Sequence, residues 1–429
     1  MSYIKKHKKR KVLVINSLVL ILGLAISGVT FASNVSGGNS NSNWTIYAWQ
    51  NYSYDFIDND DRNLSRVAGN AAHIGFASSI DSGMSLGDVP IKVNFQCEQF
   101  TFYNRFSGGD FCERNSKIGL AGVWGEIMFA NWLLPFNEMI AQWIDPWYDA
   151  DLNSHSTLMG QAGSGGFGGW YTPGDFDSNG SEFAFDGVTH QTFNRRQEDL
   201  IQYWSPNING LNFRFAVTSG VRDSSGPNDL DPRIWSTGIS YTNGPFWAAV
   251  TYQEHDEWSA TELSGGDFPA PGITSCTDSD DKAMRVAANY THDWSNGVST
   301  RVAGMYEDLE FETECDAPTF WDDLEKDGYY FSLKHTLGNG WDLRGSYAKA
   351  NELDCGGGIC GTVSEDDTGA EQIVVGVAYT MPAGTELRVS YGMVDNESNA
   401  NYDVGINGAQ SGTRGDDIDY WSFGIVQWF

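Results

Sequence analysis

A segment near the C-terminus reads Glu386-Leu387-Arg388-Val389-Ser390-Tyr391-Gly392-Met393, in which polar or small residues alternate with apolar ones. Because successive side chains of a β-strand point to opposite faces, this pattern predicts a strand with one face suited to lipid and the other to water. The same alternation occurs in 211–218 and in 372–379. Alternating segments of about ten residues are typical of membrane β-barrels, although a soluble β-sandwich gives a similar pattern.

The connections between these segments alternate in length. Asn209-Gly210, Asn243-Gly244, 295–297 and 338–340 are tight turns, whereas the intervening connections are long and acidic. Short turns on one rim and long loops on the other indicate a membrane barrel. We therefore predict an all-β fold, a 16-stranded antiparallel transmembrane β-barrel, with strands near 44–55, 69–79, 89–103, 114–123, 126–134, 195–206, 211–221, 232–243, 246–257, 283–294, 298–310, 328–337, 341–351, 370–381, 385–396 and 417–429.

The insertion 135–191 breaks the pattern, because it is polar and shows no strand periodicity. It contains the glycine-rich run 164–170, which reads Ser-Gly-Gly-Phe-Gly-Gly-Trp. A compact domain rarely carries about 50 structureless residues without a functional reason or disorder. We expect the barrel to hold this insertion as a functional loop. Its acidic candidates are Asp175, Asp177, Glu182 and Asp186.

The first 32 residues predict a secretory signal peptide. A basic run at 5–11 precedes the apolar run 12–29, and cleavage after Ala32 fits the small-residue rule. A retained membrane anchor is the alternative, because the apolar run is nearly long enough to span a bilayer. The barrel domain is then 33–429.

Charge and hydropathy limit the possible partners. The chain has a formal charge of −30, and removing the signal takes away six Lys or Arg and no acid, which leaves −36. Nucleic acid is therefore an unsuitable partner. Beyond the signal no apolar run approaches the roughly 20 residues of a transmembrane helix, so membrane crossing requires a barrel.

Six cysteines suit an oxidising compartment. The simplest of about fifteen possible connectivities joins neighbours in the predicted hairpins and loops. A metal site is the rival reading, but the cysteine pairs lack adjacent histidines. The simplest pairing is Cys97 with Cys112, Cys276 with Cys315, and Cys355 with Cys360.

Acidic clusters at 278–281, 365–367 and 416–417 are either solvated loop charge or Ca²⁺ sites, and none has an EF-hand pattern. The sequence lacks the nucleophile-elbow, zinc-protease and phosphate-loop motifs. Its histidines do not have metal-ligand spacing. We therefore predict no enzyme activity and no required cofactor, although two carboxylates of a glycosidase would be hard to recognise among 56 acids.

The last strand ends on Phe429, and this ending resembles that of outer-membrane barrels. Three further segments resemble the general bacterial porins, the trimeric sixteen-stranded barrels of Gram-negative outer membranes: Ala-His-Ile-Gly-Phe at 72–76, 115–122, and Tyr-Trp-Ser-Pro-Asn-Ile-Asn-Gly-Leu at 203–211. The resemblance extends over essentially all of the mature chain. It implies that Phe429 is read as a signal by the barrel assembly machinery.

The resemblance also implies that 135–191 is the third loop, which folds inward and narrows the pore opposite a basic wall. Residue by residue, the wall positions carry His73, Lys117 and Arg196, of which the first two depart from arginine. A neutral imidazole and a point-like ammonium weaken the basic side. Strand phase adds lumen-facing basic candidates, which are alternatively plain solvated charge: Lys92, Arg214, Arg285, Arg344 and Arg388.

These features predict a multi-pass barrel in the Gram-negative outer membrane, assembled as a homotrimer among lipid and lipopolysaccharide. Its expected function is a water-filled channel for passive diffusion of small hydrophilic solutes and ions, with a preference for cations. Two alternatives remain. One is a substrate-specific porin, with 167–171 as a sugar-stacking surface, and the other is a structural or adhesive barrel that presents acidic loops.

Overall fold

The computed structural model describes residues 35–39, 42–59, 62–101, 111–161, 193–218, 232–257, 276–315, 323–356, 359–360, 363–400, 402–404 and 415–429. All of them belong to one compact unit, Asn34–Phe429. The signal peptide predicted at 1–32 lies outside the described residues. None of the described helices is both long and apolar enough to cross a membrane.

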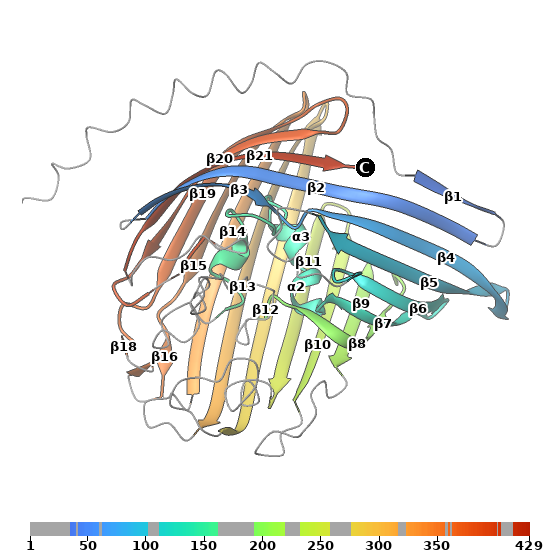
Figure 1. Cartoon of the computed structure of the whole chain (residues 1–429), viewed down its shortest axis with the longest axis horizontal. Coiled ribbons are helices and arrows are strands. Elements are labelled where there is room, and N and C mark those ends of the chain that lie inside the picture. Colours follow the sequence, from blue (N-terminus) through green and yellow to red (C-terminus); the bar gives the residue numbers. More distant parts are fainter. Residues whose placement is uncertain are drawn as a thin grey trace, which may run out of the picture. The chain divides into compact units, whose positions relative to one another are not determined.

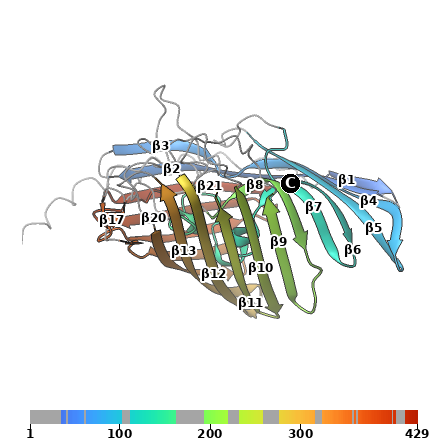
Figure 2. The same ribbon diagram turned by 90° about the horizontal axis from the view of Figure 1, so that it is seen from below.

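The described strands form a closed antiparallel barrel of sixteen strands, as the sequence predicted. Figures 1 and 2 show the sheet curving round on itself. The strands are β2 (Ser42–Asn59), the interrupted strand β3 (Arg62–Gly69) with β4 (His73–Leu86), β5 (Val89–Phe100), β6 (Ser116–Gly122), β7 (Gly125–Leu133), β8 (Arg196–Trp204), β9 (Leu211–Thr218), β10 (Arg233–Asn243), β11 (Phe246–Asp256), β12 (Cys276–Ser295), β13 (Val298–Cys315), β14 (Asp323–Leu337), β15 (Trp341–Ala350), β19 (Ala370–Thr380), β20 (Glu386–Asn396) and β21 (Ile418–Trp428).

The barrel closes where its last strand pairs with its first. β21 lies antiparallel to β2, and the register joins Trp428 to Trp49 and Ile418 to Asn59. The other short strands are β1 (Val35–Asn39), β16 (Asp354–Cys355), β17 (Ile359–Cys360) and β18 (Val363–Ser364). β1 extends the β2 edge beyond the seam, β16 pairs with β14, and β17 pairs with β18.

Side-chain alternation is inverted relative to a soluble protein. In β20 the polar residues Glu386, Arg388 and Ser390 are buried, and the intervening residues are the more exposed ones. Large apolar side chains are exposed on many other strands, for example Phe129 and Ile118. A polar inner face and an apolar outer face are what a barrel in lipid requires. The alternation at 386–393 therefore predicted the strand and its two faces correctly.

The tight turns have backbone conformations that their residues favour. Between β12 and β13, Asn296 and Gly297 have φ values of 52° and 77°. Two successive positive φ angles are typical of the two-residue hairpin turn whose twist matches antiparallel strands. Gly244 and Gly338 also have positive φ in the neighbouring short turns. These turns explain why the hairpin count from the sequence was correct.

Several predicted strand limits were wrong. β12 begins at Cys276 and β13 ends at Cys315, so the acids around Asp280, which were placed in a loop, belong to a strand. The hairpin extends because backbone pairing continues, with Asp280 opposite Glu312. The strand predicted at 69–79 is also longer and is interrupted at 70–72.

The beginning of the insertion forms three short helices rather than structureless chain. They are α2 (Pro135–Glu138), α3 (Ala141–Ile144) and the 3₁₀ helix η1 (His155–Thr157). Figure 1 shows α2 and α3 within the curve of the sheet. We call residues 135–161 the inner segment. The loop acids predicted at Asp175, Asp177, Glu182 and Asp186, and the aromatic run 167–171, lie outside the described residues.

Glycines on the wall make room for the inner segment. A Cβ atom at Gly238 would lie 2.6 Å from Sδ of Met139, and one at Gly376 would lie 2.9 Å from the ring of Trp147. Distances this short between carbon and another heavy atom are not tolerated without a shift. The wall sequence is therefore fitted to this segment as well as to its own strand pairing.

A disulfide joins Cys97 of β5 to Cys112, at a sequence separation of 15 residues. The backbone of Cys276 pairs with that of Cys315, and Cys355 is disulfide-bonded. The side chains of Cys276, Cys315 and Cys360 lie outside the described residues, so those two pairings remain predictions.

We expect the Cys97→Ser/Cys112→Ser double variant to fold into a barrel of lower stability. Opening a loop of about 15 residues increases the entropy of the unfolded chain, which costs about 3 kcal/mol of unfolding free energy. The urea midpoint of oxidised wild-type protein, compared with that of the variant, measures the loss. Reduced wild-type protein is the matched control and should behave like the variant; an equal midpoint for all three would contradict the expectation.

Candidate functional site

The inner segment follows the inside of the wall from β10 to β21. It begins where the Phe136 backbone N–H donates to Ser236 on β10 and the Thr251 hydroxyl of β11 donates to the Phe136 carbonyl. It reaches β21 at Leu152, whose carbonyl accepts a hydrogen bond from the Tyr420 hydroxyl. Wall side chains thus supply the donors and acceptors that a buried, irregular backbone needs.

The segment then returns to β13 and β14, where a buried charge cluster holds it. The carboxylate of Glu307 accepts from the Gly160 backbone N–H at 2.7 and 2.9 Å. The same carboxylate lies 2.8 Å from Arg285 and 3.9 Å from Lys326. The Lys326 ammonium also donates to the carbonyls of Leu158 and Gln161. All three charged side chains are fully buried.

A second buried cluster lies at β15 and β20. Arg344 pairs with Glu386 at 2.5 Å and with Asp342 at 3.0 Å, and it also donates to the Pro146 carbonyl. The Tyr148 hydroxyl donates to Glu386 at 2.7 Å. Burial and the Glu386 charge raise the pKa of Tyr148 to about 12, although Arg344 opposes the shift.

Next to it, Arg388 pairs with Asp151 of the inner segment at 2.5 Å and donates to Asn51 at 2.7 Å. Burial raises the pKa of Asp151 to about 6, against the lowering effect of Arg388. Four of the five lumen candidates contact the inner segment through its backbone or its side chains, namely Arg214, Arg285, Arg344 and Arg388. These residues therefore hold the inner segment against the barrel wall, in addition to the lumen-facing role that the sequence predicted for them.

Two of the three basic-wall candidates lie together, with a residue that the sequence analysis did not select. Arg114 pairs with Glu98, and its guanidinium lies 3.4 Å from Nε2 of His73. Arg114 and Arg196 both lie over the ring of Phe100, at 5.6 and 5.7 Å from its centroid. Arg196 donates a hydrogen bond to a neutral group, the side-chain oxygen of Asn115, at 3.0 Å.

Lys117, the third wall candidate, belongs to a separate group. Its ammonium lies 2.8 Å from Glu126 and 4.2 Å from the centroid of Trp204. Arg214 covers the same ring at 4.4 Å and pairs with Glu138 of the inner segment. The structure therefore divides the predicted wall into a His73–Arg114–Arg196 group and a Lys117–Arg214 group.

Two other predicted residues lie away from these groups. Lys92 is exposed and is paired in register with Ala121. Phe429 follows the last strand, where its backbone N–H donates to the Ala48 carbonyl at 2.9 Å. Of the predicted Ca²⁺ clusters, Asp280 is paired with Lys282, and Asp367 lies with Glu352 and Glu397 in an exposed group. Ca²⁺ binding there stays a prediction.

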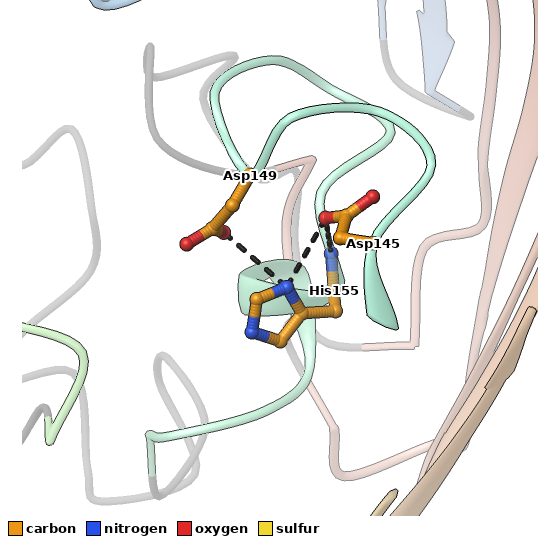
Figure 3. Close-up of side chains that lie close together, drawn as sticks. All are labelled: Asp145, Asp149 and His155. Atoms are coloured by element: carbon orange, nitrogen blue, oxygen red, sulfur yellow. Dashed lines mark hydrogen bonds and ion pairs between the residues drawn. The ribbon is translucent and has the colours of Figure 1, made fainter. Parts of the chain in front are cut away.

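The turn within the inner segment gathers Asp145, Asp149 and His155 (Figure 3). Nδ1 of the buried His155 lies 3.1 Å from Asp145 and 3.3 Å from Asp149. Burial lowers the pKa of His155, but the two carboxylates raise it by more, so the net shift is upward. None of the three was a sequence candidate, since their spacing of four and six residues fits no metal or catalytic motif.

The residues that sequence reasoning missed share a cause. Arg114 was placed at the first position of the strand predicted at 114–123, but β6 begins only at Ser116, so strand alternation does not give the direction of Arg114. Glu307 lies on β13 among other acids, and its contacts with Arg285, Lys326 and Gly160 distinguish it from them. Strand phase could have indicated that Glu307 points inward together with Met305, but not what it faces.

A closed barrel with an apolar outer face and a polar inner face defines an outer-membrane β-barrel protein. Residues 18–399 match the family model described as Gram-negative porin. The chain belongs to the Gram-negative porin family. It is a multi-pass β-barrel channel protein of the outer membrane.

Individual relatives agree with this assignment. Outer membrane porin protein 32 of Delftia acidovorans is 21% identical over 406 residues, covering 92% of this chain and 94% of the relative. The solved anion-selective porin from Comamonas acidovorans has a TM-score of 0.63 at 19% identity, covering 90% of this chain and all of that one. In-vitro folded OmpT of Vibrio cholerae has a TM-score of 0.59 at 9% identity, covering 93% and 100%.

Proposed function

We propose that the protein is a general channel for passive diffusion of small hydrophilic solutes and ions, that it prefers cations, and that it catalyses no reaction. The observation that carries this proposal is the inner segment, which wall side chains hold along the inside of the barrel from β10 to β21. Chain folded into a barrel narrows the route through it, and charges beside a narrowing sort ions. The constriction is proposed for the whole insertion, 135–191.

Cation preference is supported by the way in which the wall charges are paired. Arg285, Arg344 and Arg388 each lie within 2.8 Å of a carboxylate oxygen. Lys117 and Arg214 also pair with carboxylates. Paired charges contribute little net field at a distance, because the two signs cancel and salt screens the remainder.

Two observations weigh against the proposal. Arg196 has a neutral partner in Asn115, so its charge is less compensated than those of the other wall cations. The Comamonas acidovorans relative is described as anion-selective. The reversal potential of the wild-type channel across a salt gradient decides between cation and anion preference.

We expect the Lys117→Ala/Arg196→Ala double variant to raise the cation-to-anion permeability ratio. Each removed charge changes the energy of an ion passing at about 4 Å by about 1 kcal/mol in water, which is a factor of about five. Loss of Lys117 also removes the cation that pairs with the Glu126 carboxylate. The reversal potential of reconstituted channels across a salt gradient reports the ratio.

Lys282→Ala is the matched control, because Lys282 pairs with Asp280 near the outer end of β12. It should leave the reversal potential unchanged. If the double variant also behaves like wild type, Lys117 and Arg196 do not line the narrowest part of the pore, and the proposed residue roles fail. Anion preference in the wild type would refute the cation proposal itself.

The two alternative functions give different results in simple assays. A structural or adhesive barrel would insert into planar bilayers without conducting. A sugar-specific porin would admit one class of solute faster than another of equal size in liposome swelling. The general-channel proposal predicts conductance and rates that fall with solute size.

We also propose a homotrimer in contact with outer-membrane lipid and lipopolysaccharide and inserted by the barrel assembly machinery. An OmpT structure of Vibrio cholerae is described as a trimer form. Cross-linking of the native outer membrane tests the trimer, and a single monomeric species would contradict it.

A further inference from the structure

Asp145, Asp149 and His155 form a cluster inside the barrel that the channel proposal does not use. Asp145 ends α3, His155 begins η1, and Asp149 lies in the turn between them. Figure 3 shows both carboxylates directed toward the same ring nitrogen. Asp145 and His155 are buried, whereas Asp149 is partly exposed, which leaves the cluster one open side.

The hydrogen bonds around the ring fix its orientation. The Asn137 amide nitrogen donates to Asp149 at 2.9 Å, while its oxygen accepts from Arg285 at 3.0 Å. That oxygen also lies 3.3 Å from Nε2 of His155. Because the oxygen can only accept, Nε2 carries the proton of this contact.

Nδ1 is then the nitrogen that faces two carboxylates. In the neutral ring with Nε2 protonated, Nδ1 is an acceptor, and it would face one oxygen of each carboxylate with no proton between it and either oxygen. A positively charged species must therefore lie between Nδ1 and the two carboxylate oxygens. It is either a second proton on the ring or a metal ion that takes the lone pair of Nδ1.

We propose that Nδ1 of His155 and one carboxylate oxygen each from Asp145 and Asp149 form a binding site for a divalent transition-metal ion of the Zn²⁺ class. Zn²⁺ binds imidazole nitrogen and carboxylate oxygen at about 2.0–2.2 Å, so tetrahedral ligands lie about 3.3 Å apart. Nδ1 lies at 3.1 and 3.3 Å from the two oxygens. The three ligand atoms all lie within 4.8 Å of one another.

The surroundings of the ligands support the same assignment. Asp149 also accepts from the hydroxyls of Ser154 and Ser156, and Asp145 accepts from the backbone N–H groups of Trp147 and His155. Metal ligands are commonly held by such outer hydrogen bonds, and a metal-bound His donates its other N–H. The fourth position, on the open side at Asp149, is left for water.

Metal binding replaces a proton. When the imidazolium binds the ion, the Nδ1 proton is released to the buffer and the Nδ1 lone pair forms the bond to the metal. Nε2 keeps its proton, which it donates to the Asn137 oxygen. The ion would tie the two ends of the turn 145–155 together. It would therefore stabilise the inner segment independently of which ion or solute the channel prefers.

The test uses the full-length folded protein in detergent, washed with chelator and then titrated with ZnCl₂ by calorimetry. We expect one tight Zn²⁺ per chain in the wild type. Asp149→Asn and His155→Gln should each weaken binding by more than the roughly 10–100-fold that loss of an outer partner costs. Zn²⁺ should also raise the thermal unfolding midpoint of wild type and not that of Asp149→Asn, since only a ligand that binds the folded state stabilises it.

Two matched controls should bind as wild type. His335→Gln removes a histidine whose Nδ1 lies 2.8 Å from the Thr300 hydroxyl, and Glu352→Gln removes one acid of the exposed group with Asp367. Equal binding by wild type, Asp149→Asn and His155→Gln would place the ion elsewhere and overturn the proposal. No stoichiometric binding to folded wild type would also overturn it and leave an ion-paired imidazolium. If His155→Gln does not fold, Asp149→Asn decides, because Asn keeps the size and one acceptor of Asp149.

Discussion

Glu307→Ala is expected to release the inner segment from the wall and to lower stability by about 3–5 kcal/mol, the usual cost of breaking a buried ion pair. The substitution leaves Arg285 and Lys326 buried without their carboxylate, and it removes the acceptor of the Gly160 N–H. Both losses act on the point where the segment returns along the wall. We expect a lower thermal midpoint and, because the channel widens, a larger single-channel conductance.

Glu325→Ala is the matched control, since Glu325 lies on the same hairpin but on the exposed face of β14. It should leave conductance and unfolding unchanged. Glu307→Gln should give an intermediate result, because the amide keeps an acceptor for Gly160 but carries no charge. Wild-type conductance in Glu307→Ala would show that this contact does not hold the segment.

Deletion of Trp428 and Phe429 is expected to reduce the amount of folded barrel at least about tenfold, since 1–2 kcal/mol already changes a folding equilibrium 5–30-fold. Trp428 stacks on Trp49 at 5.3 Å, and Phe429 exchanges two backbone hydrogen bonds with Ala48. Their loss shortens the seam between β21 and β2. An unpaired edge in lipid leaves backbone groups without partners, and this cost exceeds that of the lost side-chain contacts.

The deletion is assayed in two settings. Heat-modifiable protein in the outer membrane reports assembly in cells, and refolding into lipid vesicles reports closure without any cellular machinery. Trp341→Ala, which removes an exposed aromatic ring outside the seam, is the control and should fold normally. Normal refolding in vesicles combined with failure in cells would mean that Phe429 is only a recognition signal and would contradict the closure argument.

Individual positions show how far sequence reasoning reached into the candidate site. Strand phase placed Arg285, Arg344 and Arg388 on the inner face, because direction depends only on odd and even positions. It could not show that Arg388 faces Asp151, because Asp151 lies in the irregular inner segment, far away in sequence. Arg285 and Glu307 differ from this pair, because they lie opposite each other in the β12–β13 hairpin. Arg114 was missed because the strand predicted at 114–123 begins two residues later, at Ser116, so the alternation of β6 does not extend to it.

The sequence by itself determined the barrel, the number of its strands, which face of each strand is polar and which is apolar, and the rim on which the short turns lie. These follow from local rules, the period of two along a strand and the few residues that accept positive φ in a hairpin. Only the tertiary structure decided where the inner segment runs, which charges neutralise one another and that Asp145, Asp149 and His155 share one nitrogen. Those contacts join positions up to 268 residues apart, such as Leu152 and Tyr420. Strand periodicity does not predict such contacts, because each of them depends on how the irregular inner segment folds against the inside of the closed barrel.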